Sequence, residues 1–330
     1  MFHIPIVLMT FRRADGLKKI INVLREIRPV KIYVLSDGGR NETEWHDVRQ
    51  CRAVVDEEID WECTVVKYFA TENCGVYQNI AMGAKKVFEN EVTAIFLEDD
   101  NLPEATFFRY CEEMLAKYEN DVRVLWVCGT NYLGRYKGKT NESYYFTQHL
   151  LPCGWASWRD KFIKYYDFTL TNYSNRREQQ IKKSFINKKL FRQQFDGVKR
   201  EALRKQRGEK FHSWDYHMLF SLVDNHMYGV VPGNNQIRNI GIDDVSEHGF
   251  HKPDRHTLNL CGMESYPMKF PLVHPKTVVS SPELDRALTR KILLPFPQRV
   301  KGYLVRFIRW ILRIPEGRRL ISFIQRGHSL

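Results

Sequence analysis

Three consecutive carboxylates, Glu98, Asp99 and Asp100, follow directly on the predominantly apolar run 92–97. Such a run is typical of a strand buried on both faces of a parallel sheet. Ligands bind α/β sheets at the carboxyl ends of their strands, so the position of the triplet predicts a binding site. Adjacent carboxylates repel one another, and a divalent cation would relieve that repulsion; oxygen ligands favour Mg²⁺ or Mn²⁺. An exposed acidic turn is the alternative interpretation.

Two further groups follow neighbouring predicted strands. Asp37 comes after the strand predicted at 31–35, and its carboxylate could accept a hydrogen bond from a nucleobase N–H or a sugar hydroxyl. The segment Thr10-Phe11-Arg12-Arg13 comes after the strand predicted at 4–9, and guanidinium groups suit a diphosphate. The alternatives are a turn role for Asp37 within Ser-Asp-Gly-Gly and solvation of the two arginines at the surface.

Strands and helices alternate through the first 130 residues, which predicts a doubly wound, mostly parallel α/β sheet. Asp15 is the expected N-cap of the first helix, and Pro103 is expected to open the fourth. Besides the runs given above, we predict strands at 64–69 and 122–128 and helices at 15–27, 44–55, 76–89 and 103–118.

The second half is less regular. We predict a basic helical region at 176–210, a helix at 213–223 and strands at 144–147 and 228–231, followed by a loop-rich segment at 232–289. Its tryptophans could stack on sugars or pack in the core, whereas its histidines are expected to serve structure rather than metal binding. These residues are Trp155, Trp158, Trp214, His212, His217 and His226.

The net charge of +12 over 330 residues is concentrated in two segments. Residues 176–210 contain 13 lysines and arginines against 4 acidic residues, and residues 290–330 contain 10 against 1. The remainder is mildly acidic, which argues against a nucleic-acid partner. The first segment could be a solvated helix face or could bind phosphate groups or a membrane.

The C-terminal segment 290–330 predicts an amphipathic helix. Its arginine face and apolar face suit the surface of an anionic membrane, and a helix docked on the core with its arginines in water is the alternative. On helical geometry the apolar face contains Leu304, Phe307, Ile308, Ile311 and Leu312, and the opposite face contains Arg306, Arg309 and Arg313.

Several other classes of protein are excluded or disfavoured. No apolar run is long enough to span a bilayer, and the N-terminal residues lack the order of a signal peptide, so the expected compartment is the cytosol. The seven cysteines form no CxxC pair, which favours reduced thiols over zinc binding. No GxGxxG follows the first strand, which argues against a dinucleotide site.

The order of these motifs resembles that of the GT-A fold nucleotide-sugar glycosyltransferases. The motifs are TFRR, SDG, NCG, IFLEDDNLPEATFFRYCEEML, GWASWRD and SWD, and they cover roughly residues 4–250. The acidic stretch with PEATFFRY is most similar to N-acetylglucosaminyltransferases of family 13 type. The GWASW and Asn239-Ile240-Gly241 elements resemble bacterial transferases that build surface polysaccharides.

The resemblance implies a metal-dependent inverting transfer from a nucleoside-diphosphate sugar, most often a UDP sugar, to a glycan or lipid-linked acceptor. It implies donor-binding roles for Thr10, Arg12, Asp37, Glu98 and Asp99. Asp100 would bind Mn²⁺ or Mg²⁺ with His248 near the phosphates, and Asp215 would be the catalytic base. Asp215 could instead be a helix N-cap, because an apolar run follows it.

We therefore expect a GT-A domain at 1–289, with a nucleotide-sugar half at 1–130 and an acceptor half at 131–289, and a basic tail at 290–330. The expected location is the cytoplasm, peripheral on the inner face of the cell membrane. Two other classes remain open. A sugar-nucleotide pyrophosphorylase shares such a sheet but normally has a glycine-rich loop after the first strand. A non-enzymatic peripheral membrane protein would leave the acidic strand end unexplained.

Overall fold

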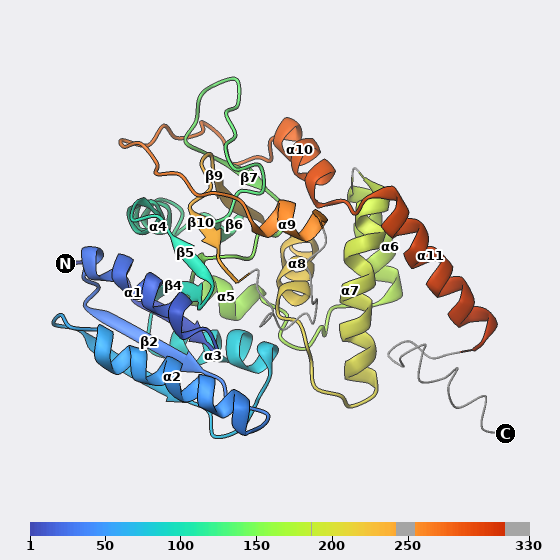
Figure 1. Ribbon diagram of the computed structural model, residues 1–330. Helices are drawn as coiled ribbons and strands as arrows, with labels where there is room; N and C mark the ends of the chain where they lie inside the picture. Colours follow the sequence, from blue (N-terminus) through green and yellow to red (C-terminus); the bar gives the residue numbers. More distant parts are fainter. Residues whose placement is uncertain (186, 242–254, 314–330) are drawn as a thin grey trace.

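The computed structural model describes residues 1–185, 187–241 and 255–313. An eight-stranded sheet with the order β3-β2-β1-β4-β8-β6-β9-β7 organises the molecule (Figure 1). Its strands are β1 (Ile6–Thr10), β2 (Lys31–Ser36), β3 (Thr64–Phe69), β4 (Thr93–Glu98), β6 (Val124–Cys128), β7 (Tyr144–Thr147), β8 (Trp155–Trp158) and β9 (Tyr228–Pro232). A second, two-stranded sheet pairs β5 (Asn101–Pro103) with β10 (Ile237–Asn239).

The main sheet is mostly parallel, as predicted. Strands β3, β2, β1 and β4 run side by side in one direction, and β6 and β9 are parallel to each other. Two strands run the other way: β8 lies antiparallel between β4 and β6, and β7 pairs antiparallel with β9. The GWASW segment therefore forms a reversed central strand, which the alternation of strands and helices did not predict.

Helices cover both faces of the sheet. On one face Ile6 and Leu8 of β1 pack with α1 (Ala14–Ile27), α2 (Glu42–Glu58) and α4 (Thr106–Lys117). On the other face Val7 and Met9 pack with the π-helix η1 (Gln78–Met82), α3 (Gly83–Phe88), α5 (Arg159–Tyr165), α8 (Asp215–Asp224) and α10 (Pro282–Ile292). Burial on both faces is the reason that the central strands are predominantly apolar.

The predicted basic region forms two helices instead of one. Helix α6 (Asn175–Ser184) and helix α7 (Lys188–Gln206) share a third hydrophobic cluster with α8. Figure 1 shows α6, α7 and α11 (Phe296–Ile311) together at the side of the molecule away from the N-terminus. The side chains of Arg306 and Asp196 pair, and Arg192 donates to the hydroxyl of Tyr303, so α11 is attached to α7.

Two local predictions were wrong. Pro103 ends β5, and α4 begins only at Thr106, because residues 101–103 pair with β10. Arg13 rather than Asp15 is the N-cap of α1. Asp15 lies in the first turn, where its negative charge interacts favourably with the helix dipole. The described part of 232–289 is loop-rich, as predicted, and it also contains β10, α9 (Arg255–Cys261) and the start of α10.

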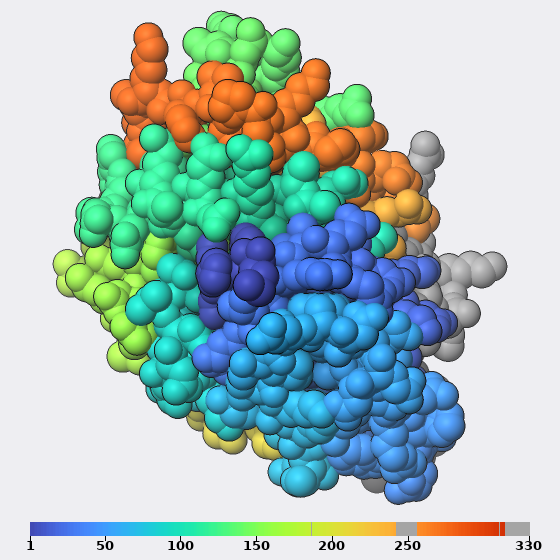
Figure 2. All heavy atoms as spheres, turned by 90° about the vertical axis from the view of Figure 1, so that its left-hand side faces the viewer, coloured from blue at the N-terminus to red at the C-terminus, as the bar shows by residue number. Residues whose placement is uncertain are grey.

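Figure 2 shows how the two halves of the chain share one face. The blue N-terminal segments lie below, and sea-green and orange segments from later in the chain lie above them. Within the described residues, no helix is both long and apolar enough to cross a membrane. The division at residue 130 and the separate tail remain predictions.

Candidate active site

A cavity of about 90 Å³ lies where β1, β2 and β4 end. It is lined by Met9, Thr10, Phe11, Arg13, Asp37, Asn73, Gly75, Val76, Asn79, Ile80, Glu98 and Asp99. The fold therefore brings four of the predicted site residues, Thr10, Asp37, Glu98 and Asp99, to one place. Sites for whole small molecules commonly measure about 300–1,000 Å³, so this cavity could enclose only part of a nucleotide sugar.

Asp99 holds the loop between β1 and α1. One oxygen of its carboxylate accepts the backbone N–H of Phe11 at 2.8 Å and that of Arg13 at 3.4 Å. Its backbone oxygen lies so close to Gly16 that a Cβ there would be 2.3 Å away. Burial, followed by the nearby Asp100, raises the pKa of Asp99 to about 6. Asp99 is therefore first a structural link between β4 and the start of α1.

Arg13 supplies the positive charge that the acidic triplet needs. Its guanidinium lies 3.6 Å from a carboxylate oxygen of Asp99 and 3.5 Å from one of Asp100. A guanidinium in this position offsets the repulsion between the carboxylates. The sequence had suggested a divalent cation for that role. Arg12, the arginine predicted for the donor, does not line the cavity; it pairs with Glu44 at 3.0 Å and Asp47 at 3.2 Å on α2.

Glu98 is a buried carboxylate whose pKa is raised. Burial raises its pKa well above the usual value, and the charges of Asp100, Asp99 and Asp215 raise it further. Asp215, 117 positions later in the chain, is therefore near enough to affect Glu98, although it does not line the cavity. A protonated carboxyl at neutral pH can donate a hydrogen bond, which an ionised one cannot.

Asp100 immediately precedes β5 and contacts the residues that follow β10. Its backbone oxygen accepts the N–H of Ile240 at 2.8 Å, and a Cβ at Gly241 would lie 2.3 Å from its carboxylate. The NIG element is thus placed directly on the acidic triplet. Among the described residues, no three His, Cys, Asp or Glu side chains gather as a metal site. His248, the other predicted metal ligand, lies outside the described residues.

Asp37 joins the loops that follow β2 and β3. Its carboxylate accepts the backbone N–H groups of Gly38 at 2.8 Å, Cys74 at 2.7 Å and Gly75 at 3.0 Å. The side-chain amide of Asn73 donates to it at 3.2 Å. These four donors occupy most of its acceptor capacity. The geometry thus favours the turn role for Asp37, and direct contact with a nucleobase stays a prediction.

Thr10 is the last residue of β1 and is 1% exposed. Its hydroxyl has no hydrogen-bond partner among the described residues, although it lies at the wall of the cavity. A buried hydroxyl without a partner costs free energy, which a ligand with a polar atom in the cavity would recover.

Helix α7 positions Asp215. Its buried Glu201 accepts the backbone N–H groups of His212 at 2.8 Å and Ser213 at 3.3 Å, in the turn that leads to α8. The Ser213 hydroxyl in turn donates to the carboxylate of Asp215, the first residue of α8. The N-cap of α8 is Trp214, so the N-cap alternative for Asp215 is wrong. Sequence reasoning missed Glu201, because nothing in a basic helix marks one acid as an anchor.

The tryptophans belong to the core and not to a sugar-binding wall. Trp155 stacks on Phe96 with ring centroids 3.8 Å apart, and it also stacks on Trp214. Trp158 is buried as well. Of the histidines, His217 is buried and contacts the backbone oxygen of Asp167 at 2.9 Å, which fits the structural role predicted for it.

The sequence matches no family model and no curated protein. Solved structures of nucleotide-sugar enzymes are similar in shape at low identity. An apo UDP-glucose pyrophosphorylase has 8% identity and a TM-score of 0.38 over 76% of this chain and 96% of its own. Mouse xyloside xylosyltransferase 1 has 9% identity and a TM-score of 0.34 over 68% and 81%.

Glucosyl-3-phosphoglycerate synthase from Mycobacterium tuberculosis, solved with Mn²⁺, UDP and glucosyl-3-phosphoglycerate, has 12% identity and a TM-score of 0.29 over 48% and 57%. These neighbours are glycosyltransferases and sugar nucleotidyltransferases. Likenesses this distant do not assign a reaction to this chain, and the resemblance to family 13 type enzymes stays a prediction.

Asp37→Ala should destabilise the fold by about 3 kcal/mol, because hydrogen bonds to a buried carboxylate are strong and their donors would lose their partner. Asp47→Ala is the matched control; it removes a partly exposed partner of Arg12 and should cost less than about 1 kcal/mol. Urea unfolding of both variants measures the difference. Equal destabilisation would contradict the structural role of Asp37.

Proposed function

We propose that this chain is a glycosyltransferase that moves a sugar, with inversion, from a nucleoside-diphosphate donor of the UDP type to a glycan acceptor. One observation carries the proposal. The cavity where β1, β2 and β4 end collects Thr10, Arg13 and Glu98, and the charge of Asp215 reaches Glu98 from a separate helix. This arrangement supports a donor-binding cavity with a second carboxylate nearby, although Asp215 does not itself line the cavity.

Arg13 replaces Arg12 as the residue that we assign to the donor diphosphate. Arg13 lines the cavity and its side chain is 16% exposed, whereas Arg12 points to α2. A guanidinium binds phosphate oxygens in two places at once, which suits a diphosphate. The Thr10 hydroxyl, which lacks a partner among the described residues, is a second group for this end of the donor.

The carboxylate of Asp100 has the hard oxygen chemistry that Mg²⁺ and Mn²⁺ prefer. Mg²⁺ commonly takes one or two carboxylates and completes its shell with substrate phosphates, so the small number of protein ligands does not conflict with a metal. Asp100 would hold the ion, and the ion would neutralise charge that develops on the leaving nucleoside diphosphate. The Arg13 guanidinium now paired with Asp100 would then be available for the donor phosphates.

Asp215 is the proposed base. It accepts the proton of an acceptor hydroxyl while that oxygen forms a bond to the anomeric carbon of the donor sugar. The bond between the anomeric carbon and the diphosphate oxygen breaks, and its electron pair leaves with the nucleoside diphosphate. The hydrogen bond from Ser213 holds the carboxylate of Asp215 in one orientation. Glu98, with its raised pKa, could donate a hydrogen bond to a donor hydroxyl.

A donor-hydrolysis assay tests the reaction class. The protein is incubated with a panel of UDP sugars and Mn²⁺ in the absence of an acceptor. Slow release of nucleoside diphosphate supports the transferase, because water can replace the acceptor hydroxyl. Release of sugar 1-phosphate on addition of pyrophosphate would instead identify a sugar nucleotidyltransferase. No product from any donor would contradict both enzymes.

Asp215→Asn should lower turnover by about 10²- to 10⁴-fold and leave the Kd for UDP nearly unchanged, because the base acts on the acceptor. Asp160→Asn is the matched control, since Asp160 is an exposed acid in the first turn of α5. Initial rates and calorimetric UDP binding separate the two effects. Near-native turnover of the Asp215 variant would remove it from the mechanism.

Arg13→Gln should weaken UDP binding by at least about tenfold, which corresponds to one charge-assisted contact of about 1.4 kcal/mol. Arg12→Gln should change the affinity by less than about threefold, because Arg12 is engaged with α2. Arg13→Lys tests whether charge alone restores binding. The opposite ranking of Arg12 and Arg13 would return the donor role to Arg12.

We further propose that α11 rests on an anionic membrane surface, as a peripheral contact at the inner face of the cell membrane, and that the acceptor is lipid-linked. The polar side of α11 faces α7 through Arg306 and Tyr303. The residues that we call the apolar stripe lie on exposed positions three or four apart: Phe296, Val300, Leu304, Phe307 and Ile311. The helix contains no acidic residue, so its charge complements an anionic bilayer.

Leu304→Ser/Phe307→Ser should reduce co-sedimentation with phosphatidylglycerol vesicles by at least about tenfold, because two exposed side chains would no longer enter the bilayer. Val92→Ser/Val122→Ser is the control, since both valines are exposed elsewhere. Wild-type protein should not bind phosphatidylcholine vesicles. If the stripe variant instead changes only the oligomeric state in ultracentrifugation, the stripe binds a second copy of the chain and the membrane proposal fails.

A further inference from the structure

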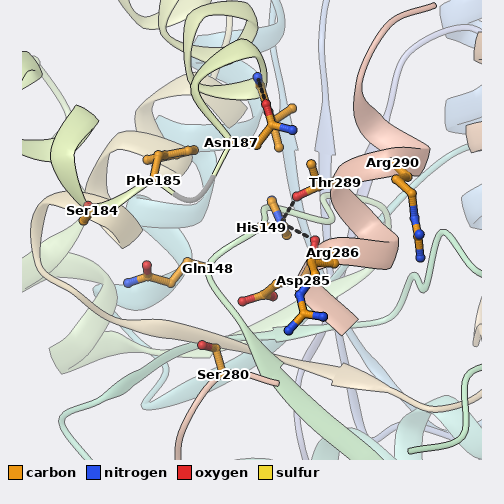
Figure 3. A pocket seen from close by; sticks show the side chains of 11 residues that line it. Gln148, His149, Ser184, Phe185, Asn187, Ser280, Asp285, Arg286, Thr289 and Arg290 are labelled. Carbon is orange, nitrogen blue, oxygen red and sulfur yellow. Dashed lines mark hydrogen bonds between the residues drawn. The ribbon is translucent and has the colours of Figure 1, made fainter. Parts of the chain in front are cut away.

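A second and larger cavity of about 370 Å³ lies between α10, the adjoining ends of α6 and α7, and the end of β7 (Figure 3). Its volume is in the range of small-molecule sites. It is lined by Gln148, His149, Ser184, Phe185, Asn187, Leu190, Ser280, Asp285, Arg286, Thr289 and Arg290. None of these residues belongs to the donor cavity.

This cavity lies toward the opposite end of the sheet. Strand β7 runs antiparallel to β9, and its last residue, Thr147, pairs with Gly229 near the start of β9. Gln148 follows and donates to the backbone oxygen of Met227 at 3.4 Å, just before β9. The donor cavity, in contrast, is at the ends of the parallel strands. A ligand here would not be the reacting sugar, so its binding does not depend on the transfer reaction.

A hydrogen-bond network holds the polar part of the cavity in place. The His149 ring nitrogen Nε2 lies 3.2 Å from both the backbone oxygen of Asp285 and the hydroxyl of Thr289 (Figure 3). The hydroxyl of Thr147 donates to the Asp285 carboxylate at 2.6 Å. The groups around Asp285 are therefore preorganised before any ligand arrives, which lowers the cost of binding.

Two arginines give the cavity a positive side. Arg286 and Arg290 lie one turn apart on α10, and both line the cavity, Arg286 beside Asp285 and Arg290 farther along the helix. Neither has a carboxylate partner within 4.0 Å among the described residues. Guanidinium groups that are not neutralised by the protein favour an anionic ligand.

The remaining lining residues suit a hydroxylated ring. The Asn187 amide oxygen caps α7 and the Ser184 hydroxyl donates to the backbone oxygen of Ile181, which leaves the Asn187 NH₂ group as a donor and the Ser184 oxygen as an acceptor for sugar hydroxyls. Gln148 adds its amide oxygen as an acceptor. Phe185 adds an aromatic wall, and its ring is fixed by edge contact with Phe191 at 5.2 Å between centroids. Such a combination of polar groups and an aromatic face is common in sites for small polar ligands.

We propose that this cavity binds an anionic saccharide, with its phosphate or carboxylate on Arg286 and Arg290 and its hydroxyls toward Asp285 and Asn187. The acidic and basic sides of the cavity would orient such a ligand in one direction. The source could be a soluble sugar phosphate or acidic glycan, or the headgroup of a lipid. The site would hold its ligand away from the catalytic cleft, as an anchor rather than a reactant.

Calorimetry with glucose 6-phosphate, glucuronic acid, inorganic phosphate and glucose tests the site on the full chain. The anionic sugars should bind at least about tenfold more tightly than glucose or phosphate alone. Arg286→Gln/Arg290→Gln should reduce that affinity by at least about tenfold. Arg49→Gln/Arg159→Gln is the control with the same change of charge, since these side chains are 59% and 39% exposed elsewhere.

Arg13→Gln shows whether the probe binds in the donor cavity instead. Binding that survives this variant and is lost in Arg286→Gln/Arg290→Gln supports the proposal. The proposal is overturned if glucose binds equally, if the α10 variant has no effect, if Arg13→Gln abolishes binding, or if no probe binds.

Competition with vesicles distinguishes the two sources. Displacement of glucose 6-phosphate by phosphatidylinositol vesicles, but not by phosphatidylglycerol vesicles, supports a lipid headgroup with a sugar-like ring. Lack of displacement by either supports a soluble saccharide. Equal displacement by both shows simple charge attraction and contradicts saccharide recognition.

Discussion

Mutual repulsion among Glu98, Asp99 and Asp100 is the constraint on which the arrangement of the cleft depends. Three carboxylates at the end of one buried strand cannot all remain ionised without a nearby positive charge. The guanidinium of Arg13 supplies this charge, 3.6 Å from a carboxylate oxygen of Asp99 and 3.5 Å from one of Asp100. Backbone N–H groups also donate to the Asp99 carboxylate. Burial raises the pKa of Glu98 well above its usual value, and the charges of Asp100, Asp99 and Asp215 raise it further.

The same type of residue has two different uses around the cleft. Asp99 and Asp37 bind backbone N–H groups and thereby fix the loops after β1, β2 and β3. Glu98 and Asp215 hold no loop through backbone N–H groups in this way, and they come from separate elements. Carboxylates that anchor loops make the cavity rigid. Carboxylates that do not anchor loops are the ones that can bind a substrate or transfer a proton.

Helix α7 links the cleft to the rest of the molecule. Its Glu201 holds the turn before Asp215, its surface residues Asp196 and Arg192 hold α11, and Gln193 accepts the N–H of Leu294 at 2.8 Å after α10. The proposed base, the proposed membrane helix and the second cavity are therefore attached to one helix. The positive charge of this region, which suggested a ligand-binding surface, belongs largely to a packing element.

Local pattern determined the elements and the grouping at the strand ends. Parallel strands place their carboxyl ends together, so Thr10, Asp37 and Glu98 could be assigned to one edge from alternation alone. The choice between Arg12 and Arg13 could not, because adjacent residues leave a strand in different directions and only the position of α2 decides which one faces the cavity. The reversal of β8, the anchoring of Asp215 by Glu201 and the cavity beside α10 likewise depend on contacts between residues far apart in sequence. Such contacts leave no periodic signal in the sequence, because they are set by how packed elements meet.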